Sequence, residues 1–298
     1  MLLSEYRNGN YNVKLYDDGT KVRETEGDEF IPDFAECIDI TISTRCNHGC
    51  EYCYAGCTPD GKRADLKAFE PLLNTIHEGT EIAINVNGSE DPEALRAFLE
   101  YLRDHKVIVN ATIRQDDFEK HREKLLEFED EHLVYGVGVS LLDPTPEFIT
   151  YAKEFPNLVI HVINKIVTPQ QIDALAGNDL RLLILGYKTV GRGVDYLNSD
   201  GDRISWRGEY LHDHISQYFD AFKVISFDNL ALEQIEIRRF LTDEEWNRFY
   251  QGDEGTSTFF LNLAEGYFAR DSLTPNKHAP LLDSVDEMFH VIREEVGK

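Results

Sequence analysis

The sequence predicts an α/β fold built around a parallel sheet, and two observations carry this prediction. Between Cys37 and Phe227, short apolar stretches of strand length alternate with amphipathic stretches of helix length. Such alternation is typical of right-handed βαβ units that repeat around a parallel sheet. The chain has 298 residues, 42% of them hydrophobic, which suits one main domain of the size of an α/β barrel.

The elements are expected in a regular order. A hairpin comes first, with strands Tyr11–Tyr16 and Thr20–Thr25 joined at Asp17-Asp18-Gly19, because glycine tolerates the positive φ of a tight turn. Seven strands follow: one that starts at Cys37, then Glu81–Val86, Val107–Ile113, Val134–Leu141, Leu158–Ile163, Leu180–Tyr187 and Lys223–Phe227. The helices between them are expected at Leu66–His77, Pro92–Asp104, Phe118–Asp130, Pro146–Glu154, Gln170–Ala176 and Gly208–Ala221.

Residues 229–298 contain mixed elements in place of further repeats. We expect an acidic helix Asp243–Tyr250, a strand pair near Phe259–Phe268 and a final helix Val285–Val296. The chain thus divides into a hairpin region at 1–36, a barrel at 37–228 and a C-terminal α+β extension at 229–298 that closes the open side of the barrel. The hairpin either caps one end of the barrel, which we favour, or receives substrate.

The charge balance limits the partners. The 30 Lys and Arg residues against 55 Asp and Glu give a net charge of −25, which repels phosphate backbones and argues against polymeric nucleic acid. The same charge also serves solubility or adaptation to salt. Five cysteines give no disulfide framework, the first residues lack a signal peptide's apolar core, and no apolar run reaches membrane-spanning length. We therefore expect a cytoplasmic protein without membrane contact.

The strand that starts at Cys37 leads into a loop with three cysteines. Cys46, Cys50 and Cys53 have the spacing C-x3-C-x2-C. Thiolates are the usual ligands of iron–sulfur clusters, and a four-iron cluster normally takes four of them. A loop that offers only three leaves one iron free to bind another molecule.

This motif, with Tyr52 just before the last cysteine and a strand just before the first, resembles the signature of the radical S-adenosylmethionine (SAM) enzymes. The resemblance implies a [4Fe-4S] cluster on Cys46, Cys50 and Cys53, with SAM on the open iron. In that superfamily an electron from the cluster cleaves SAM, and the resulting 5′-deoxyadenosyl radical abstracts hydrogen from substrate. It further implies a partial (β/α)6-type barrel, which suits seven strands, and an electron donor of the flavodoxin or ferredoxin type.

A longer pattern covers nearly the whole chain. The segments at 18–21, 57–62, 186–193 and 227–231 resemble a group of short radical SAM proteins of phage and bacterial genomes, and this likeness implies no particular reaction. The extension has no cysteine, so auxiliary clusters are not expected. A zinc site remains the alternative, since His48 or Cys57 could complete a tetrahedral ligand set. We predict that Cys57 is not a ligand.

Binding residues are expected where the parallel strands end, because the loops there meet above the barrel. After the second strand, Asn87, Gly88 and Ser89 occupy the place of the Gly-Gly-Glu type segment of the resembled family, which contacts the amino group of SAM. The glycine pair is missing, but these residues still offer polar groups suited to an ammonium. The alternative is a polar helix start.

The next strands offer four further cofactor candidates, and the cysteine loop offers a fifth, Tyr52. Asn110 and Thr112 lie on one alternating face of the third strand, where they could meet a ribose or the substrate. Ser140 matches the position from which the resembled family contacts the ribose, although a serine bonded to backbone is an equal alternative. Ile166 follows the fifth strand, beside the adenine, and the Tyr52 backbone would read the adenine amino edge.

Three residues are predicted on the substrate side. Lys188 and Arg192 bring positive charge to the barrel mouth after the sixth strand, and Asp228 follows the last strand. The alternative for the two cations is a surface loop that pairs with nearby carboxylates. Our first hypothesis is radical modification of a peptide or protein side chain. The second is a nucleotide or small anionic metabolite, held by Lys188 and Arg192, and the third is a zinc-binding interaction module without catalysis.

Overall fold

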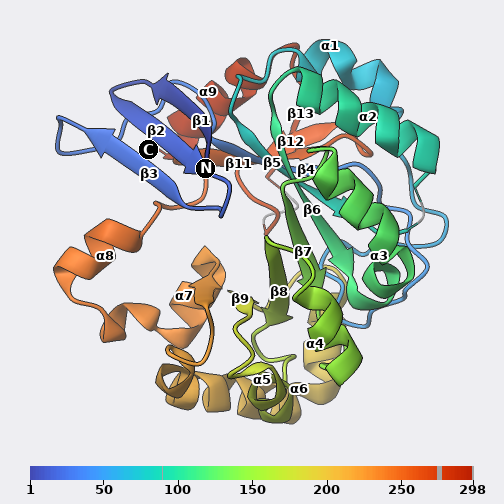
Figure 1. The fold of residues 1–298 in the computed structure, drawn as a ribbon, viewed down its shortest axis with the longest axis vertical. Coiled ribbons are helices and arrows are strands. Elements are labelled where there is room, and N and C mark those ends of the chain that lie inside the picture. The colour runs from blue at the N-terminus through green and yellow to red at the C-terminus, as the bar shows by residue number, and fades with distance from the viewer. Residues whose placement is uncertain (89, 274–276, 297–298) are drawn as a thin grey trace.

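The computed structural model describes residues 1–88, 90–273 and 277–296, and its centre is a ten-stranded sheet (Figure 1). The strand order is β10-β9-β8-β7-β6-β5-β4-β11-β12-β13. Eight of these strands are parallel: β4 (Cys37–Thr41), β5 (Glu81–Val86), β6 (Ile108–Arg114), β7 (Gly136–Ser140), β8 (Leu158–Ile163), β9 (Arg181–Leu185), β10 (Val224–Phe227) and β11 (Thr258–Asn262). β12 (Tyr267–Ala269) and β13 (Ala279–Pro280) continue the sheet in antiparallel fashion.

The structure describes nine α-helices, and most of them cover the outer face of the sheet. They are α1 (Glu70–Leu73), α2 (Pro92–Asp104), α3 (Gln115–Asp130), α4 (Pro146–Ala152), α5 (Pro169–Leu175), α6 (Arg192–His214), α7 (Asn229–Ile235), α8 (Asp243–Phe249) and α9 (Val285–Val296), with short 3-10 turns at Leu66–Phe69, Ile215–Tyr218 and Ile237–Phe240. In Figure 1 the helices α2 to α6 follow one another along the outside of the curved sheet. None of the described helices is both long enough and apolar enough to span a membrane.

The two faces of the strands differ in character. On β5, Ile82 and Ile84 point to the helices and are buried, whereas Ala83 and Asn85 point into the barrel. β8 repeats the pattern with Ile160 buried outside. Burial of each such branched side chain contributes roughly 1.5–3 kcal/mol, so the core lies between sheet and helices. The inward-facing side chains are partly accessible and line cavities.

Local signals fix where the helices begin. The side chain of Asp91 accepts a hydrogen bond from the backbone N–H of Ala94, and Pro92 takes the first helical position of α2. Thr145 and Thr168 cap α4 and α5 in the same way, each followed by proline. A proline at this position loses no helical hydrogen bond, so the chain turns sharply from each loop into its helix.

A three-stranded sheet lies against the amino-terminal ends of the barrel strands. It contains β1 (Leu2–Asn8), β2 (Tyr11–Tyr16) and β3 (Lys21–Thr25), of which β1 was not expected. Lys21 Nζ lies 2.5 Å from Glu81 at the start of β5, and the Asn157 amide donates to the carbonyl of Asp17. This is the arrangement that the capping interpretation expects, at the end opposite the cysteine loop.

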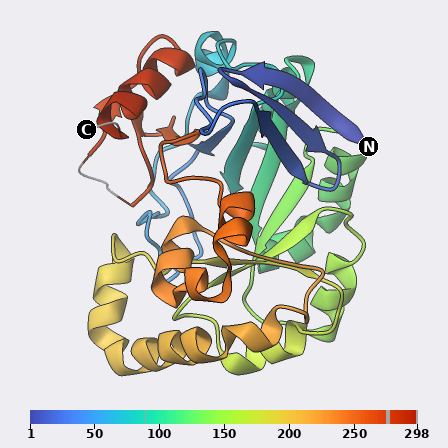
Figure 2. The same ribbon diagram turned by 90° about the vertical axis from the view of Figure 1, so that its left-hand side faces the viewer.

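The C-terminal extension extends one edge of the sheet and covers its open side. β11 pairs in parallel with β4, and no pairing joins β10 to β11 among the described residues. The connection between these two strands contains α7 and α8, which face the viewer in Figure 2. Helix α9 contacts β11 from the outside.

Two helices differ from the expectation. The segment predicted as a helix at 66–77 contains only a 3-10 turn and the single turn α1. Helix α6 begins at Arg192, not at Gly208, and contains one non-helical residue, Asp200. Its first half is polar and includes Gly201, so it lacks the apolar period that marks a helix in a sequence.

Candidate functional site

The cysteine loop leaves β4 and folds back on itself at the carboxyl ends of the strands. Its two sides are joined by hydrogen bonds from Cys46 N to Thr58 O at 2.9 Å and from Ala64 N to Ile42 O at 2.9 Å. Cys46, Cys50 and Cys53 line one cavity of about 450 Å³, together with Cys57. The loop therefore presents all three predicted ligands to a single space.

The spacing of the thiols bears on which metal they suit. A tetrahedral zinc site, with Zn–S bonds of about 2.3 Å, would bring its sulfur atoms to about 3.8 Å of one another. Among the described residues, the metal-ligand atoms that crowd within 4.8 Å in groups of three or more belong to His48, Asp116 and Asp117, and no cysteine is included. A cubane binds each cysteine to a different iron, so it needs no such crowding. As they lie here, the described cysteine sulfurs lack the crowding of a tetrahedral zinc site, and the loop offers the three thiols that a cluster with one open iron would take.

Cys57 lies beside Cys53. A hydrogen bond from the Cys57 thiol lowers the pKa of Cys53 to about 5. Burial raises the pKa of Cys46. These contacts describe the thiols without a metal, and the expectation that Cys57 is not a ligand stays a prediction.

Arg192, at the start of α6, holds the cysteine loop from the side. Its Nε donates to the carbonyl of Cys50 and its Nη1 to the carbonyl of Cys57, both at 2.8 Å, while its backbone N–H donates to Cys53 O at 3.1 Å. Gly191 before it has φ +55°, and a Cβ there would lie 2.1 Å from the carbonyl oxygen of Tyr54. Only glycine allows this close approach.

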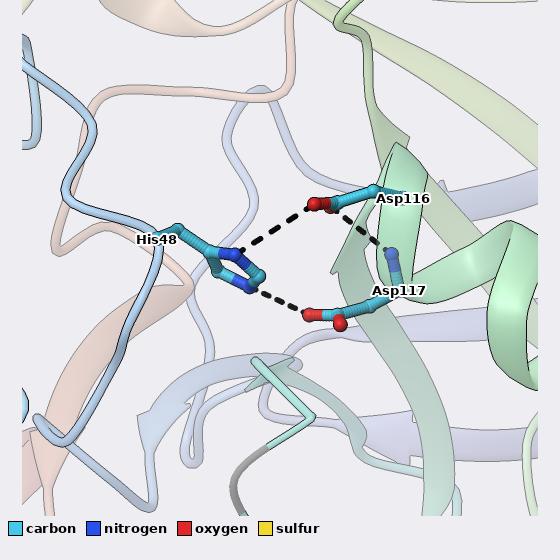
Figure 3. A group of neighbouring side chains, drawn as sticks. All are labelled: His48, Asp116 and Asp117. Atoms are coloured by element: carbon cyan, nitrogen blue, oxygen red, sulfur yellow. Dashed lines mark hydrogen bonds and ion pairs between the residues drawn. The ribbon is translucent and has the colours of Figure 1, made fainter.

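A second group of side chains holds the loop from β6 and α3 (Figure 3). His48 Nε2 lies 2.6 Å from Asp117 Oδ2, and His48 Nδ1 lies 3.8 Å from Asp116 Oδ2. Arg114 at the end of β6 bonds to Asp116, with Nε to Oδ1 at 2.7 Å, and its Nη1 lies 3.7 Å from Cys50 Sγ. A cation beside a ligand sulfur stabilises negative charge on a cluster.

The structure brings five predicted cofactor residues to the cysteine cavity. Tyr52, Asn87, Thr112, Ser140 and Ile166 all line it, from five different segments of the chain. The Asn87 amide donates to the carbonyl of Arg45 at 2.6 Å, which ties the loop after β5 to the cysteine loop.

Two of the other cofactor candidates lie elsewhere. Gly88 has φ +69° and packs against Asp117, whose carboxylate would lie 2.9 Å from an added Cβ. Asn110 is at the other end of the barrel, where its amide contacts Glu81 Oε1 at 3.5 Å and lines the cavity of about 350 Å³ below the N-terminal sheet. Asn110 precedes Thr112 by two residues on β6, which separates the two positions by about 6.6 Å along the strand. Ser89 lies outside the described residues.

A second cavity, of about 420 Å³, adjoins the first. The two share the wall formed by Tyr52, Tyr54, Asn85, Thr112, Ser140, His161, Ile163 and Leu185. The charged side chains of the second cavity are Asp39, Lys188, Asp228, Glu254, Arg270 and Asp271. Lys188 and Asp228 thus meet here, whereas Arg192 does not line this cavity.

The contacts of Lys188 and Asp228 are mostly structural. Lys188 Nζ donates to Ser272 Oγ at 2.8 Å and lies 4.0 Å above the ring of Tyr54. Asp228 Oδ1 accepts from Gly186 N at 2.8 Å and from Ala231 N at 2.7 Å, so this oxygen caps α7.

Three carboxyl groups of this cavity, those of Asp39, Asp228 and Glu254, have raised pKa values. Burial, followed by the charges of Asp39 and Asp271, raises the pKa of Glu254 to about 7. Burial also raises the pKa of Asp39, with a smaller effect from Asp228 in the same direction, while Lys188 opposes both. Burial raises the pKa of Asp228 as well. The single lysine does not offset the negative charge around it.

Sequence reasoning missed His161, which lies at the centre of the barrel. It lines both cavities and also the lower one, and its ring covers Gly138, where a Cβ would lie 2.3 Å from His161 Cε1. Burial lowers the pKa of His161 to about 4, so the imidazole is neutral at pH 7. It forms no hydrogen bond with any residue that the structure describes. The inward position of His161 on β8, paired with Ser140 and next to the small Gly138, was the available signal.

Comparison with known proteins gives similarity in structure alone. No family model and no curated protein matches the chain by sequence. Among solved structures, Streptococcus suis SuiB bound to the precursor peptide SuiA matches with a TM-score of 0.59 and 16% identity, over 87% of this chain and 65% of that chain. SuiB bound to S-adenosylmethionine matches with a TM-score of 0.57 and 16% identity, over 84% of this chain and 64% of that chain.

The fold is that of SuiB. The α/β partial barrel expected from the radical SAM resemblance is thereby confirmed. The chain spans about 65% of the length of the SuiB chain, so the activity of the whole SuiB protein does not transfer with the fold.

Proposed function

We propose that this protein is a radical SAM enzyme that modifies a side chain of a peptide or protein. In this proposal Cys46, Cys50 and Cys53 hold a [4Fe-4S] cluster, and SAM occupies the cavity of about 450 Å³ that these cysteines line. The observation that carries the proposal is this convergence of the three thiols with Asn87 and Ser140 in one cavity, on a fold shared with SuiB, which has been solved with SAM and with its precursor peptide.

When bound, the cluster and SAM would supply one-electron cleavage and a 5′-deoxyadenosyl radical, chemistry that belongs to the cofactors. The chain's own residues would bind and orient SAM and enclose the reacting groups. Asn87 and the cysteine loop form the polar end of the cavity, and the hydroxyls of Thr112 and Ser140 offer hydrogen bonds to a ribose. Ile166 gives an apolar surface suited to a base, and Arg207 supports it with a bond of 2.9 Å to its carbonyl.

The second cavity is the proposed place of the reacting side chain. It shares the wall of Thr112, Ser140 and His161 with the first, so a group bound there would lie beside the proposed SAM site. Tyr52 and Tyr54 also border both spaces and restrict the access of water. A reactive radical needs such enclosure, because side reactions with solvent or protein end turnover.

The peptide hypothesis is preferred over the anionic metabolite. The latter depended on Lys188 and Arg192 acting together, and Arg192 instead bonds to carbonyls of the cysteine loop. Lys188 lies among carboxylates that would repel an anion. The electron is proposed to come from a donor of the flavodoxin or ferredoxin type.

The test is anaerobic purification and cluster reconstitution. We expect about four iron and four acid-labile sulfide per chain and, with dithionite and SAM, formation of 5′-deoxyadenosine, measured by liquid chromatography and mass spectrometry. Serine at Cys46, Cys50 or Cys53 should abolish both. Cys57→Ala is the matched control and should keep them.

The proposal fails if the protein binds stoichiometric zinc without sulfide. Loss of the cluster in Cys57→Ala would show a four-thiolate site with no open iron for SAM.

A further inference from the structure

We propose that the cavity of about 420 Å³ binds a positively charged group of the substrate, such as the ammonium of a lysine side chain or a guanidinium. The place of this cavity beside the SAM site rests on the proposed function. Its charge selectivity rests on the side chains that line it.

The charges lining the cavity do not balance. Among the described residues that line it, four carboxylates, Asp39, Asp228, Glu254 and Asp271, face two cations, Lys188 and Arg270, which leaves 2 − 4 = −2 when all are ionised. Arg270 is engaged by Asp271, with Nε to Oδ2 at 3.0 Å. Lys188 therefore remains as the cation near the other three carboxylates.

Asp39 points to a missing partner. It lies on β4, where its neighbours Ile38 and Ile40 are buried, and its own side chain is exposed and lines the cavity. It forms no hydrogen bond or close ion pair with any residue in the described ranges. A carboxylate that lines an acidic cavity and has no partner in the described ranges is available for a charge-assisted hydrogen bond from a cationic ligand.

His161 gives a second, independent sign of a ligand. Its imidazole is enclosed at the border of the two cavities, has no hydrogen-bond partner among the described residues, and is uncharged at pH 7. A neutral imidazole can accept a hydrogen bond from an N–H donor without repelling a cation. The cavity thus offers acceptors from two elements, β4 and β8, to the same donor.

The raised pKa of Glu254 predicts how binding of a cation should depend on pH. The charged groups that face it are Asp39 on β4, Lys188 after β9, Asp228 before α7 and Asp271 after β12. With a pKa of about 7, Glu254 is half protonated at neutral pH when the cavity is empty. A bound cation favours the ionised carboxyl, so binding releases a proton and tightens as pH rises through about 7.

The experiment titrates three small probes into the reconstituted protein with SAM. They are the Nα-acetyl methylamides of lysine, norleucine and glutamate, which share a backbone and differ in side-chain charge. We expect the lysine compound to bind at least tenfold more tightly than the norleucine compound, and the glutamate compound not to bind. Calorimetry in two buffers of different ionisation enthalpy should show proton release at pH 7.

Variants of the lining residues test which side chains produce the charge selectivity. Asp39→Asn and Glu254→Gln should each weaken the lysine probe about tenfold, whereas Lys188→Met, which removes a competing cation, should tighten it. The opposite sign in Lys188→Met separates charge selectivity from misfolding. Glu147→Gln, an exposed carboxylate on α4, is the matched control and should change nothing.

Equal binding of the lysine and norleucine probes, or preference for the glutamate probe, would overturn the inference. So would unchanged affinity in both Asp39→Asn and Lys188→Met. Iron, sulfide and substrate-free SAM cleavage are measured on the same samples. If iron, sulfide and SAM cleavage are present and charge selectivity is absent, the inference fails and the proposed function stands. If zinc replaces the cluster, the proposed function fails, and the binding of the three probes alone decides the inference.

Discussion

His161 shows what a single enclosed residue contributes to this molecule. Its ring takes the space that Gly138 leaves open, and burial holds it neutral. Its inward position follows from the alternation of β8, where Leu158, Ile160 and Val162 point outward. The predictions from the ends of the strands included Ser140 and Thr112 but not His161, because a histidine in the middle of a strand belongs to no recognisable motif.

We predict that His161 makes the protein lose stability below neutral pH. The pKa is about 4 when folded and about 6.5 when unfolded, so unfolding takes up a proton between these values. Stability from this residue is therefore complete above pH 6.5 and falls as pH drops. At pH 5.5, above the isoelectric point near 4.7, the loss should be about 1.4 kcal/mol.

Urea unfolding of wild type and His161→Gln at pH 7.5 and 5.5 measures this loss of stability. The free energy of unfolding of wild type relative to that of His161→Gln should be lower at pH 5.5 than at pH 7.5 by about 1.4 kcal/mol. His121→Gln, an exposed histidine on α3, is the control. An identical pH dependence in wild type and His161→Gln would show that the imidazole is already charged or solvated.

At the scale of elements, helix α6 serves the cysteine loop. The sequence predicted most strands and helices within two or three residues, because their apolar periods and their Asp, Thr and Pro starts are strong. It did not predict that α6 starts at Arg192, since the first turns are polar and follow a glycine-rich break. Arg192 was consequently assigned to a substrate, whereas its guanidinium bonds to Cys50 and Cys57 carbonyls.

We predict that Arg192→Gln weakens the cluster loop and leaves charge selectivity for substrate unchanged. Two hydrogen bonds from a charged donor are lost, which should cost roughly 2–4 kcal/mol in the stability of the loop. Iron content after reconstitution should fall, and limited proteolysis should cut the loop at 46–57 faster. Arg203→Gln, an exposed residue later in the same helix, is the matched control. Full iron content in Arg192→Gln together with lost substrate binding would return Arg192 to the substrate site.

At the scale of the whole molecule, the two ends of the barrel have separate tasks. The cysteine loop and the two adjoining cavities of about 450 and 420 Å³ lie toward the carboxyl ends of the strands, and the N-terminal sheet covers the opposite ends. The overall architecture could be predicted from the repeat of strands and helices. The place of β11 beside β4 could not, because pairing between segments more than 200 residues apart leaves no local signal.

The contact between sheet and barrel gives the last prediction. Glu36 is fully buried between them, where its carboxylate accepts from Arg23 Nε at 3.0 Å, lies 3.5 Å from Lys21 Nζ and accepts from the hydroxyl of Tyr11. Glu36→Gln removes the negative partner of Arg23 and one of the two carboxylates beside Lys21, which keeps Glu81, and breaking a buried ion pair typically costs about 3–5 kcal/mol. We expect a clear loss in the free energy of unfolding, measured in urea.

The same variant distinguishes a cap from a docking site. If the sheet only closes the barrel, Glu36→Gln at 15 °C should keep the iron content, SAM cleavage and probe binding of wild type, because the cavities lie at the other end. Glu24→Gln, the exposed partner of Lys14 on the same sheet, should change neither stability nor activity. Unchanged stability together with reduced turnover of a peptide substrate would contradict the capping role and place substrate on the N-terminal sheet.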